Sequence, residues 1–200
     1  MTDDYAATGW QAGVGAVLML LLTIAVVSDI RQRRIPNVLV LVTLVAGVLF
    51  HSLGPQASGA GGLFSMQPGP LGGWRALGGA LAGLLLFLPF YVLRLLGAGD
   101  VKLLAAVGAF AGTAAFLNIA LWVLLAGGVL ALARMAWTGN AGLVLFNVRA
   151  IVGQRLPGRR VDVDVSTRTA WRMPYAVAIA SGVVAYGAWI LGGHTPWLDF

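Results

Sequence analysis

The sequence predicts an all-α, polytopic integral membrane protein with about six transmembrane helices, and three observations carry this prediction. Hydrophobic residues make up 59% of the 200 residues and charged residues only 10%, whereas soluble domains carry about 25% charged residues. Several apolar runs approach the roughly 20 residues that a helix needs to cross a bilayer. The basic residues gather between these runs on one side of the predicted membrane. The lipid bilayer is therefore the first partner implied, and no nucleic acid is needed to explain the net charge of +6.

The whole chain, residues 1–200, forms one predicted membrane domain whose helices follow its apolar runs. The six helices cover about residues 10–27, 38–53, 76–96, 101–112, 114–137 and 174–191, and residues 138–172 form a cytoplasmic loop. The first run follows an acidic flank without lysine or arginine, which favours an anchored helix over a cleaved signal peptide. A Gly/Pro/Ser-rich loop separates the second run from the third. The fourth run is short, because about 12 helical residues span only about 18 Å, so it crosses only where the membrane thins or the helix ends dip into the bilayer.

Charge asymmetry sets the predicted orientation. With the N-terminus outside, every lysine and arginine except Arg75 falls in a cytoplasmic loop or at the helix end beside it. Both termini are then extracytoplasmic, and the membrane is the inner (cytoplasmic) membrane. In the long loop, residues 143–152 predict an amphipathic helix on the membrane surface, with the arginines of the loop against anionic headgroups. We expect His51 and His194, on the outer side, to be solvated or interfacial.

The chain has no cysteine and no glutamate, so its acidic chemistry depends on seven aspartates. Five of these lie in the predicted outer tails or in the arginine-flanked loop. The other two, Asp29 and Asp100, lie at helix ends on the cytoplasmic side. Because ionisable groups within membrane helices are costly, these two residues are the candidates for function.

Two carboxylates at one membrane depth favour aspartyl-protease chemistry. Like charges held close together cannot both ionise, so one carboxyl keeps its proton. The ionised carboxylate takes a proton from water, and the protonated one donates to the scissile carbonyl. This chemistry needs no metal and no cofactor. Gly97 and Gly99 can adopt positive φ and let a peptide backbone approach Asp100 closely, and they are expected to break the third helix before the fourth.

The same residues allow other interpretations. Asp29 would pair with Arg31 or Arg33 as an ordinary charge at the membrane surface, and Asp100 would cap the helix that it begins. A carboxylate pair in a bundle would also serve a non-enzymatic proton or cation pathway. Lys102 either faces the aspartates or extends its amine to the lipid headgroups.

Three motifs in the chain resemble those of the type IV prepilin peptidases. The motifs are SDIRQRRIPN at residues 28–37, GAGDVKLL at residues 97–104 and RMPYAVAIASG at residues 172–182. They are similar to the family's first-aspartate motif, its Gly-x-Gly-Asp motif and the Pro-Tyr-containing start of its last helix. Gly-x-Gly-Asp alone is a weak signal, but the three motifs in this order are specific, and together they cover nearly the whole chain.

The resemblance implies an aspartic-type endopeptidase that cleaves the leader peptide of type IV or Flp-type prepilins, or of pseudopilins, at the cytoplasmic membrane face. Asp29 and Asp100 match the catalytic pair, and five residues match the motif positions that support it or bind substrate: Pro36, Asn37, Gly97, Gly99 and Lys102. The pilus-assembly machinery is a further implied partner. Because the cysteine-rich zinc domain of the longer enzymes is absent, the chain is similar to the short form that serves tight-adherence (Flp) pili.

Two alternatives to this activity stay open. One is a non-enzymatic membrane protein, either the proton or cation pathway or an inactive pilus-assembly subunit. The other is an intramembrane protease of the presenilin type, which shares the Gly-x-Gly-Asp motif. In that type the first aspartate usually follows a tyrosine in the middle of a helix, whereas Asp29 follows Ser28 and precedes a basic loop.

Overall fold

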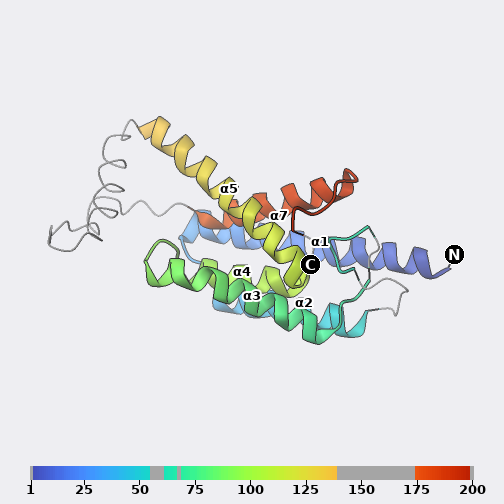
Figure 1. The fold of residues 1–200 in the computed structure, drawn as a ribbon. Helices are drawn as coiled ribbons and strands as arrows, with labels where there is room; N and C mark the ends of the chain where they lie inside the picture. Colours follow the sequence, from blue (N-terminus) through green and yellow to red (C-terminus); the bar gives the residue numbers. More distant parts are fainter. Residues whose placement is uncertain (1, 55–60, 67–68, 139–173, 199–200) are drawn as a thin grey trace, which may run out of the picture. The chain divides into compact units, whose positions relative to one another are not determined.

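The computed structural model describes residues 2–54, 61–66, 69–138 and 174–198, and these residues form helices joined by turns and short loops (Figure 1). The helices are α1 (Thr2–Gln32), α2 (Asn37–Leu53), α3 (Gly73–Val92), α4 (Ala98–Ala111), α5 (Thr113–Thr138) and α7 (Tyr175–Leu191). The described part contains no strand, only an isolated bridge between Gly62 and Gly69. The predicted surface helix at 143–152, and all of the loop 138–172 except Thr138, lie outside the described residues.

The chain divides into two compact units. The first comprises Met1–Ala126 and Pro174–Phe200, and the second comprises Gly127–Met173. Every candidate site residue belongs to the first unit, so the description below concerns that unit.

The helices have the length and composition of a membrane protein, although they do not establish six separate crossings. Three stretches are long and apolar enough to span a bilayer: Gly9–Gln32, Gly73–Val92 and Ala98–Ala133. The third contains α4 and most of α5, which separate at Gly112, where φ is +74°. Helices α2 and α7 have 17 residues each, or about 26 Å, which is a little short of a hydrocarbon core of about 30 Å.

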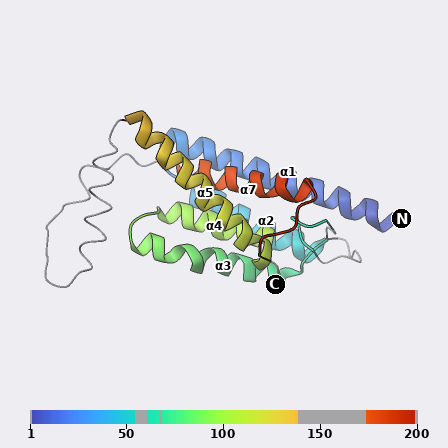
Figure 2. The same ribbon diagram turned by 45° about the horizontal axis from the view of Figure 1, so that its top comes forward.

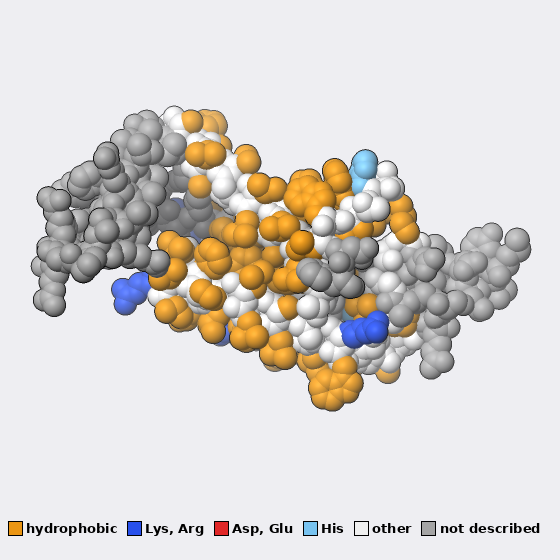
Figure 3. All heavy atoms as spheres, in the orientation of Figure 1, with side chains coloured by type: hydrophobic (Ala, Val, Ile, Leu, Met, Phe, Trp, Pro, Cys, Tyr) orange, Lys and Arg blue, Asp and Glu red, His pale blue; other side chains and the backbone are white. Residues whose placement is uncertain are grey.

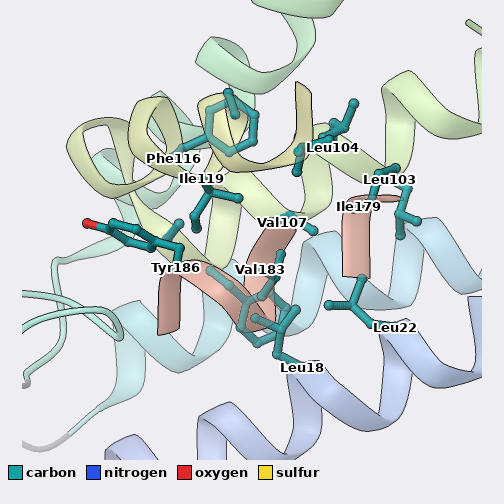
Figure 4. Close-up of a cluster of buried hydrophobic side chains, with 14 of the residues drawn as sticks. Leu18, Leu22, Leu103, Leu104, Val107, Phe116, Ile119, Ile179, Val183 and Tyr186 are labelled. Atoms are coloured by element: carbon teal, nitrogen blue, oxygen red, sulfur yellow. The ribbon is translucent and has the colours of Figure 1, made fainter. Parts of the chain in front are cut away.

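Helix α4 lies in the middle of the first unit and is buried on nearly all sides. Its residues from Leu103 to Ala111 are all buried, which is expected for a helix that is apolar all round. Figure 4 shows leucines from α1 and α4 meeting side chains of α5 and α7, among them Phe116, Ile179 and Tyr186. The short fourth run is thus a core helix.

Small residues let the helices around α4 approach closely. Gly79 of α3 contacts Gly108 of α4 backbone to backbone. One turn later, a Cβ added at Gly83 would lie 2.7 Å from the carbonyl oxygen of Leu104. This Gly-x-x-x-Gly spacing is a common device for close packing of membrane helices.

The first unit contains two groups of helices. Helix α4 packs most extensively on α3 and then on α2, whereas α1 packs mainly on α7 (Figures 1 and 2). We call these the α2–α3–α4 group and the α1–α7 group. Smaller contacts between α1 and α2 and between α4 and α7 join them.

Asp29, Asp100 and the three sequence motifs lie at one end of the unit. Helices α1 and α3 end there, and α2, α4 and α7 begin there (Figures 1 and 2). Exposed basic residues surround this end: Arg31, Arg33, Arg34, Arg94 and Lys102. Along the helices the visible surface is mostly hydrophobic, with basic side chains near its ends (Figure 3). Exposed leucines and valines on α1, α2 and α3 give the flanks an apolar surface suited to lipid.

Candidate active site

Asp29 lies in the last turn of α1 and is held by the start of α7. Its side chain is only 7% exposed, and its Oδ2 accepts a hydrogen bond from the Ala176 N–H at 3.1 Å. The first N–H groups of a helix have no partner within the helix and favour a negative charge. In the part of the chain that the structure describes, Asp29 forms no ion pair with Arg31 or Arg33. Its environment is therefore that of a positioned, desolvated carboxylate.

The turn after Asp29 is fixed by local hydrogen bonds. The Arg33 N–H donates to the carbonyl oxygen of Asp29 at 2.9 Å, and Arg33 takes a left-handed conformation with φ of 51°. The Ser28 hydroxyl donates to the carbonyl oxygen of Arg34 at 2.9 Å. Such a φ costs a residue other than glycine about 1–2 kcal/mol, and strained residues of this kind collect at functional sites. Pro36, with φ of −61°, then precedes the first residue of α2.

Asp100 occupies the first turn of α4 and caps it, as one of the alternative interpretations expects. Its Oδ2 accepts from the Gly97 N–H at 3.1 Å, while the Asp100 N–H donates to the Gly97 carbonyl oxygen at 3.1 Å. The carboxylate is only partly buried. Capping does not exclude catalysis, because the bond to Gly97 also fixes the direction of the carboxylate.

Gly97 and Gly99 do not use the positive φ that glycine can adopt. Gly97 has φ of −76°, and Gly99 is not among the positive-φ residues. The left-handed residue that ends α3 is instead Arg94, with φ of 58°. Because Arg94 already reverses the chain, the glycines provide space instead: a Cβ at Gly97 would meet the Asp100 carboxylate, and one at Gly99 would meet Ile35.

The first two motifs contact each other directly. Gly99 lies against Ile35, because a Cβ at Gly99 would be 3.4 Å from the Ile35 Cβ. The Lys102 amine donates to the side-chain oxygen of Asn37 at 3.2 Å. Lys102 is exposed. Its hydrogen bond links the start of α4 to the start of α2, a contact that neither of the two expected roles includes.

The third motif contacts the first aspartate. The N–H of Ala176, the second residue of α7, donates to Asp29 Oδ2 across the unit. The sequence indicated a motif here but no role for Ala176, since nothing in a separation of 147 residues predicts a backbone contact with Asp29.

His51, at the other end of α2, is not solvated as expected. It is 1% exposed, and its Nδ1 accepts from the Leu71 N–H at 3.1 Å. Nε2 therefore carries the proton and donates to the carbonyl oxygen of Phe110 at 2.7 Å. The histidine fastens the segment before α3 to the end of α4. His194 is exposed, as expected, and stacks on Trp189.

The site offers carboxylate chemistry. Among the residues described, no three histidine, cysteine or acidic side chains gather into a group that would hold a metal. A helical membrane bundle with two aspartates at one end defines a class: integral membrane proteins with a carboxylate-based candidate site.

Comparison with known families then places the chain. The model of the type IV leader peptidase family matches residues 16–132, which is more than half of the chain. The matched range includes Asp29 and Asp100 and ends before α7. The chain belongs to the type IV leader peptidase family, as the three motifs predict. No curated protein and no solved structure matches it significantly.

Proposed function

We propose that this protein is a membrane-embedded aspartyl endopeptidase that cleaves the leader peptide of type IV or Flp-type prepilins. Cleavage takes place at the cytoplasmic face of the inner membrane, with Asp29 and Asp100 as the catalytic pair. Family membership supports a peptidase in general. The observation that supports the specific proposal is the hydrogen bond from the Ala176 N–H to Asp29 Oδ2, at the end of the unit where α4, with Asp100 in its first turn, also begins.

The proposed reaction is hydrolysis by one activated water molecule. One carboxylate takes a proton from water as the water oxygen bonds to the scissile carbonyl carbon, and the other carboxyl donates a proton to the carbonyl oxygen. Collapse of the tetrahedral intermediate breaks the C–N bond, and the leaving nitrogen takes up a proton from the pair. The Ala176 and Gly97 amides hold the two carboxylates in fixed directions, which lowers the entropic part of the barrier.

Asp29→Asn and Asp100→Asn test this mechanism. Asparagine keeps an acceptor oxygen for the Ala176 or Gly97 N–H but cannot exchange a proton, so each variant should insert normally. Each should lose cleavage by about 100- to 10,000-fold. The measurement uses membranes that contain the protein and a candidate prepilin, and mass spectrometry reads the N-terminus of the product.

The matched control is the double variant Asp3→Asn, Asp4→Asn, which makes the same chemical change in the first turn of α1. It should cleave like the unmodified protein. Substantial cleavage by either site variant would contradict the mechanism. Proton or cation flux into liposomes that depends on Asp29 and Asp100, with the prepilin left intact, would favour the pathway interpretation instead.

A further inference from the structure

The buried side chain of His51 connects three elements at the end of the unit that lies away from the aspartates. It belongs to the last turn of α2 and is 1% exposed. One ring nitrogen contacts the Leu71 N–H in the segment before α3, and the other contacts the carbonyl oxygen of Phe110 in α4. Trp10 of α1 packs against the ring, with the ring centroids 5.5 Å apart.

The two hydrogen bonds together fix the protonation state of the ring. A backbone N–H can only donate, so Nδ1, which faces Leu71, has to accept and carries no proton. A carbonyl oxygen can only accept, so Nε2, which faces Phe110, carries the proton. Both ring nitrogens are therefore satisfied in neutral histidine, and an added proton can bind only to Nδ1.

A proton on Nδ1 breaks one of these bonds and keeps the other. The new N–H would face the Leu71 N–H, and two donors cannot bond to each other. The bond from Nε2 to the Phe110 carbonyl oxygen remains and becomes charge-assisted. Protonation of the ring therefore acts on the segment before α3 and leaves α2 joined to α4.

That segment has further attachments, so it would loosen without leaving the unit. The Gly72 N–H donates to the backbone carbonyl oxygen of His51 at 3.1 Å, a bond that does not depend on the ring. The Gly69 carbonyl oxygen accepts from the Gly62 N–H at 3.1 Å. The bond to Nδ1, at Leu71, lies between these two attachments and is the one that a proton would remove.

Among the described residues, the groups that contact the ring are all uncharged: the indole of Trp10, the Phe110 carbonyl and the Leu71 amide. The charged residues on the elements packed against His51 are at the far ends of α1 and α4, in the exposed first turn of α3, and about two turns before Trp10 on α1: Asp29, Arg31, Asp100, Lys102, Arg75, Asp3 and Asp4. The ring thus has no described ion-pair partner that would keep it charged at neutral pH.

We propose that His51 is an acid-sensitive latch: protonation of Nδ1 detaches the Leu71 N–H and loosens residues 69–71, while the bonds to Phe110 and from Gly72 hold. Histidine is the side chain that ordinarily changes charge between about pH 5 and pH 8. In the predicted orientation this end is extracytoplasmic, so the latch responds to pH on the side of the membrane opposite to the aspartates. The proposal does not depend on the peptidase function.

Histidine-selective ¹⁵N labelling observes the ring directly, because the chain has only two histidines. The variant His194→Gln leaves a single labelled ring, that of His51. In a titration from about pH 7.5 to about pH 4, we expect the Nε2–H tautomer at the neutral end and a second proton on Nδ1 at the acid end. A neutral-pH tautomer with the proton on Nδ1, or a ring that is still neutral at about pH 4, overturns the proposal. Unfolding of the whole protein as the ring charges also overturns it, because the latch loosens one segment only.

Amide hydrogen exchange then locates the loosening. When the ring charges, the Leu71 amide should exchange about tenfold faster relative to the Gly72 amide, because it alone loses its acceptor. In His51→Asn, which offers an oxygen acceptor that cannot be charged, the ratio of the two exchange rates should stay constant with pH. The matched control His194→Gln should behave like the unmodified protein. A constant ratio in the unmodified protein, or the same change in His51→Asn, would show that His51 is not a latch.

Discussion

Gly97 and Asp100 hold each other through two reciprocal hydrogen bonds, and this arrangement leaves little room for a side chain at Gly97. A Cβ there would lie 3.0 Å from Asp100 Oδ2, closer than ordinary van der Waals contact. At Gly99 the nearest atom is the Ile35 Cβ, at an ordinary 3.4 Å. The two glycines of the Gly-x-Gly-Asp motif therefore differ in what they tolerate.

Gly97→Ala should displace the Asp100 carboxylate by a few tenths of an ångström and lower the cleavage rate about tenfold, because small misplacements of catalytic groups are costly. Gly99→Ala should stay within about threefold of the unmodified rate. Initial rates of prepilin cleavage, normalised to the amount of protein in the membrane, check both values. Equal losses in the two variants would contradict this account.

Sequence reasoning reached some of these residues and not others. The scarcity of acidic residues led directly to Asp29 and Asp100, because a carboxylate at a membrane helix end is conspicuous. The hydrogen-bond partners of these residues could not be predicted from the sequence, because Asp29 accepts from a backbone amide far along the chain. His51 was misjudged for a related reason: an isolated histidine in an apolar run gives no hint of a buried acceptor such as the Phe110 carbonyl.

At the scale of helices, the crossing of α3 and α4 is the tightest contact described. Gly79 and Gly108 touch backbone to backbone, so a methyl group at Gly79 has to push the two helices apart. Overpacking of this kind costs about 1–3 kcal/mol.

Gly79→Ala should therefore lower the stability of the protein by about 1–3 kcal/mol, measured by thermal or denaturant unfolding in detergent. The control is Gly13→Ala in α1, where a Cβ would meet nothing within 4 Å. There alanine should be neutral or stabilising by up to about 1 kcal/mol, because it favours helix more than glycine does. A Gly79→Ala variant as stable as the control would show that the crossing adjusts freely.

The helices themselves were largely predictable, but their ends were not. Each of the six apolar runs overlaps a described helix, because long apolar segments in a chain of this composition favour helices. The ends depend on backbone geometry: α3 stops at Val92, earlier than expected, because Arg94 turns the chain, and α4 starts at Ala98 because Gly97 precedes it as the N-cap. Helix α1 continues to Gln32, beyond its apolar run, and ends before the Pro36 turn.

At the scale of the whole molecule, the orientation in the membrane is a prediction that the chain makes easy to test. The exposed basic residues described above surround the end that holds the aspartates, and this end should face the cytoplasm. The chain has no cysteine, so a single introduced cysteine reports on one position only.

Gln32→Cys, at the end of α1, should react with a membrane-impermeant maleimide only after the cells are opened. Thr195→Cys, near the C-terminal end, should react in spheroplasts that are still sealed. Both residues are exposed, so the difference measures sidedness and not burial. The reverse pattern would invert the proposed topology and move the site to the outer face.

The division into an α1–α7 group and an α2–α3–α4 group has a consequence for how the protein responds to its surroundings. Asp29 belongs to one group and Asp100 to the other, so the gap between the two carboxyls is set by how the groups dock and not by the integrity of either one. A thinner bilayer, a harsh detergent or a small molecule bound between the groups would then separate the two carboxyls and abolish the proposed activity while every helix stays folded. Loss of activity after extraction from lipid should accordingly be reversible on return to a bilayer.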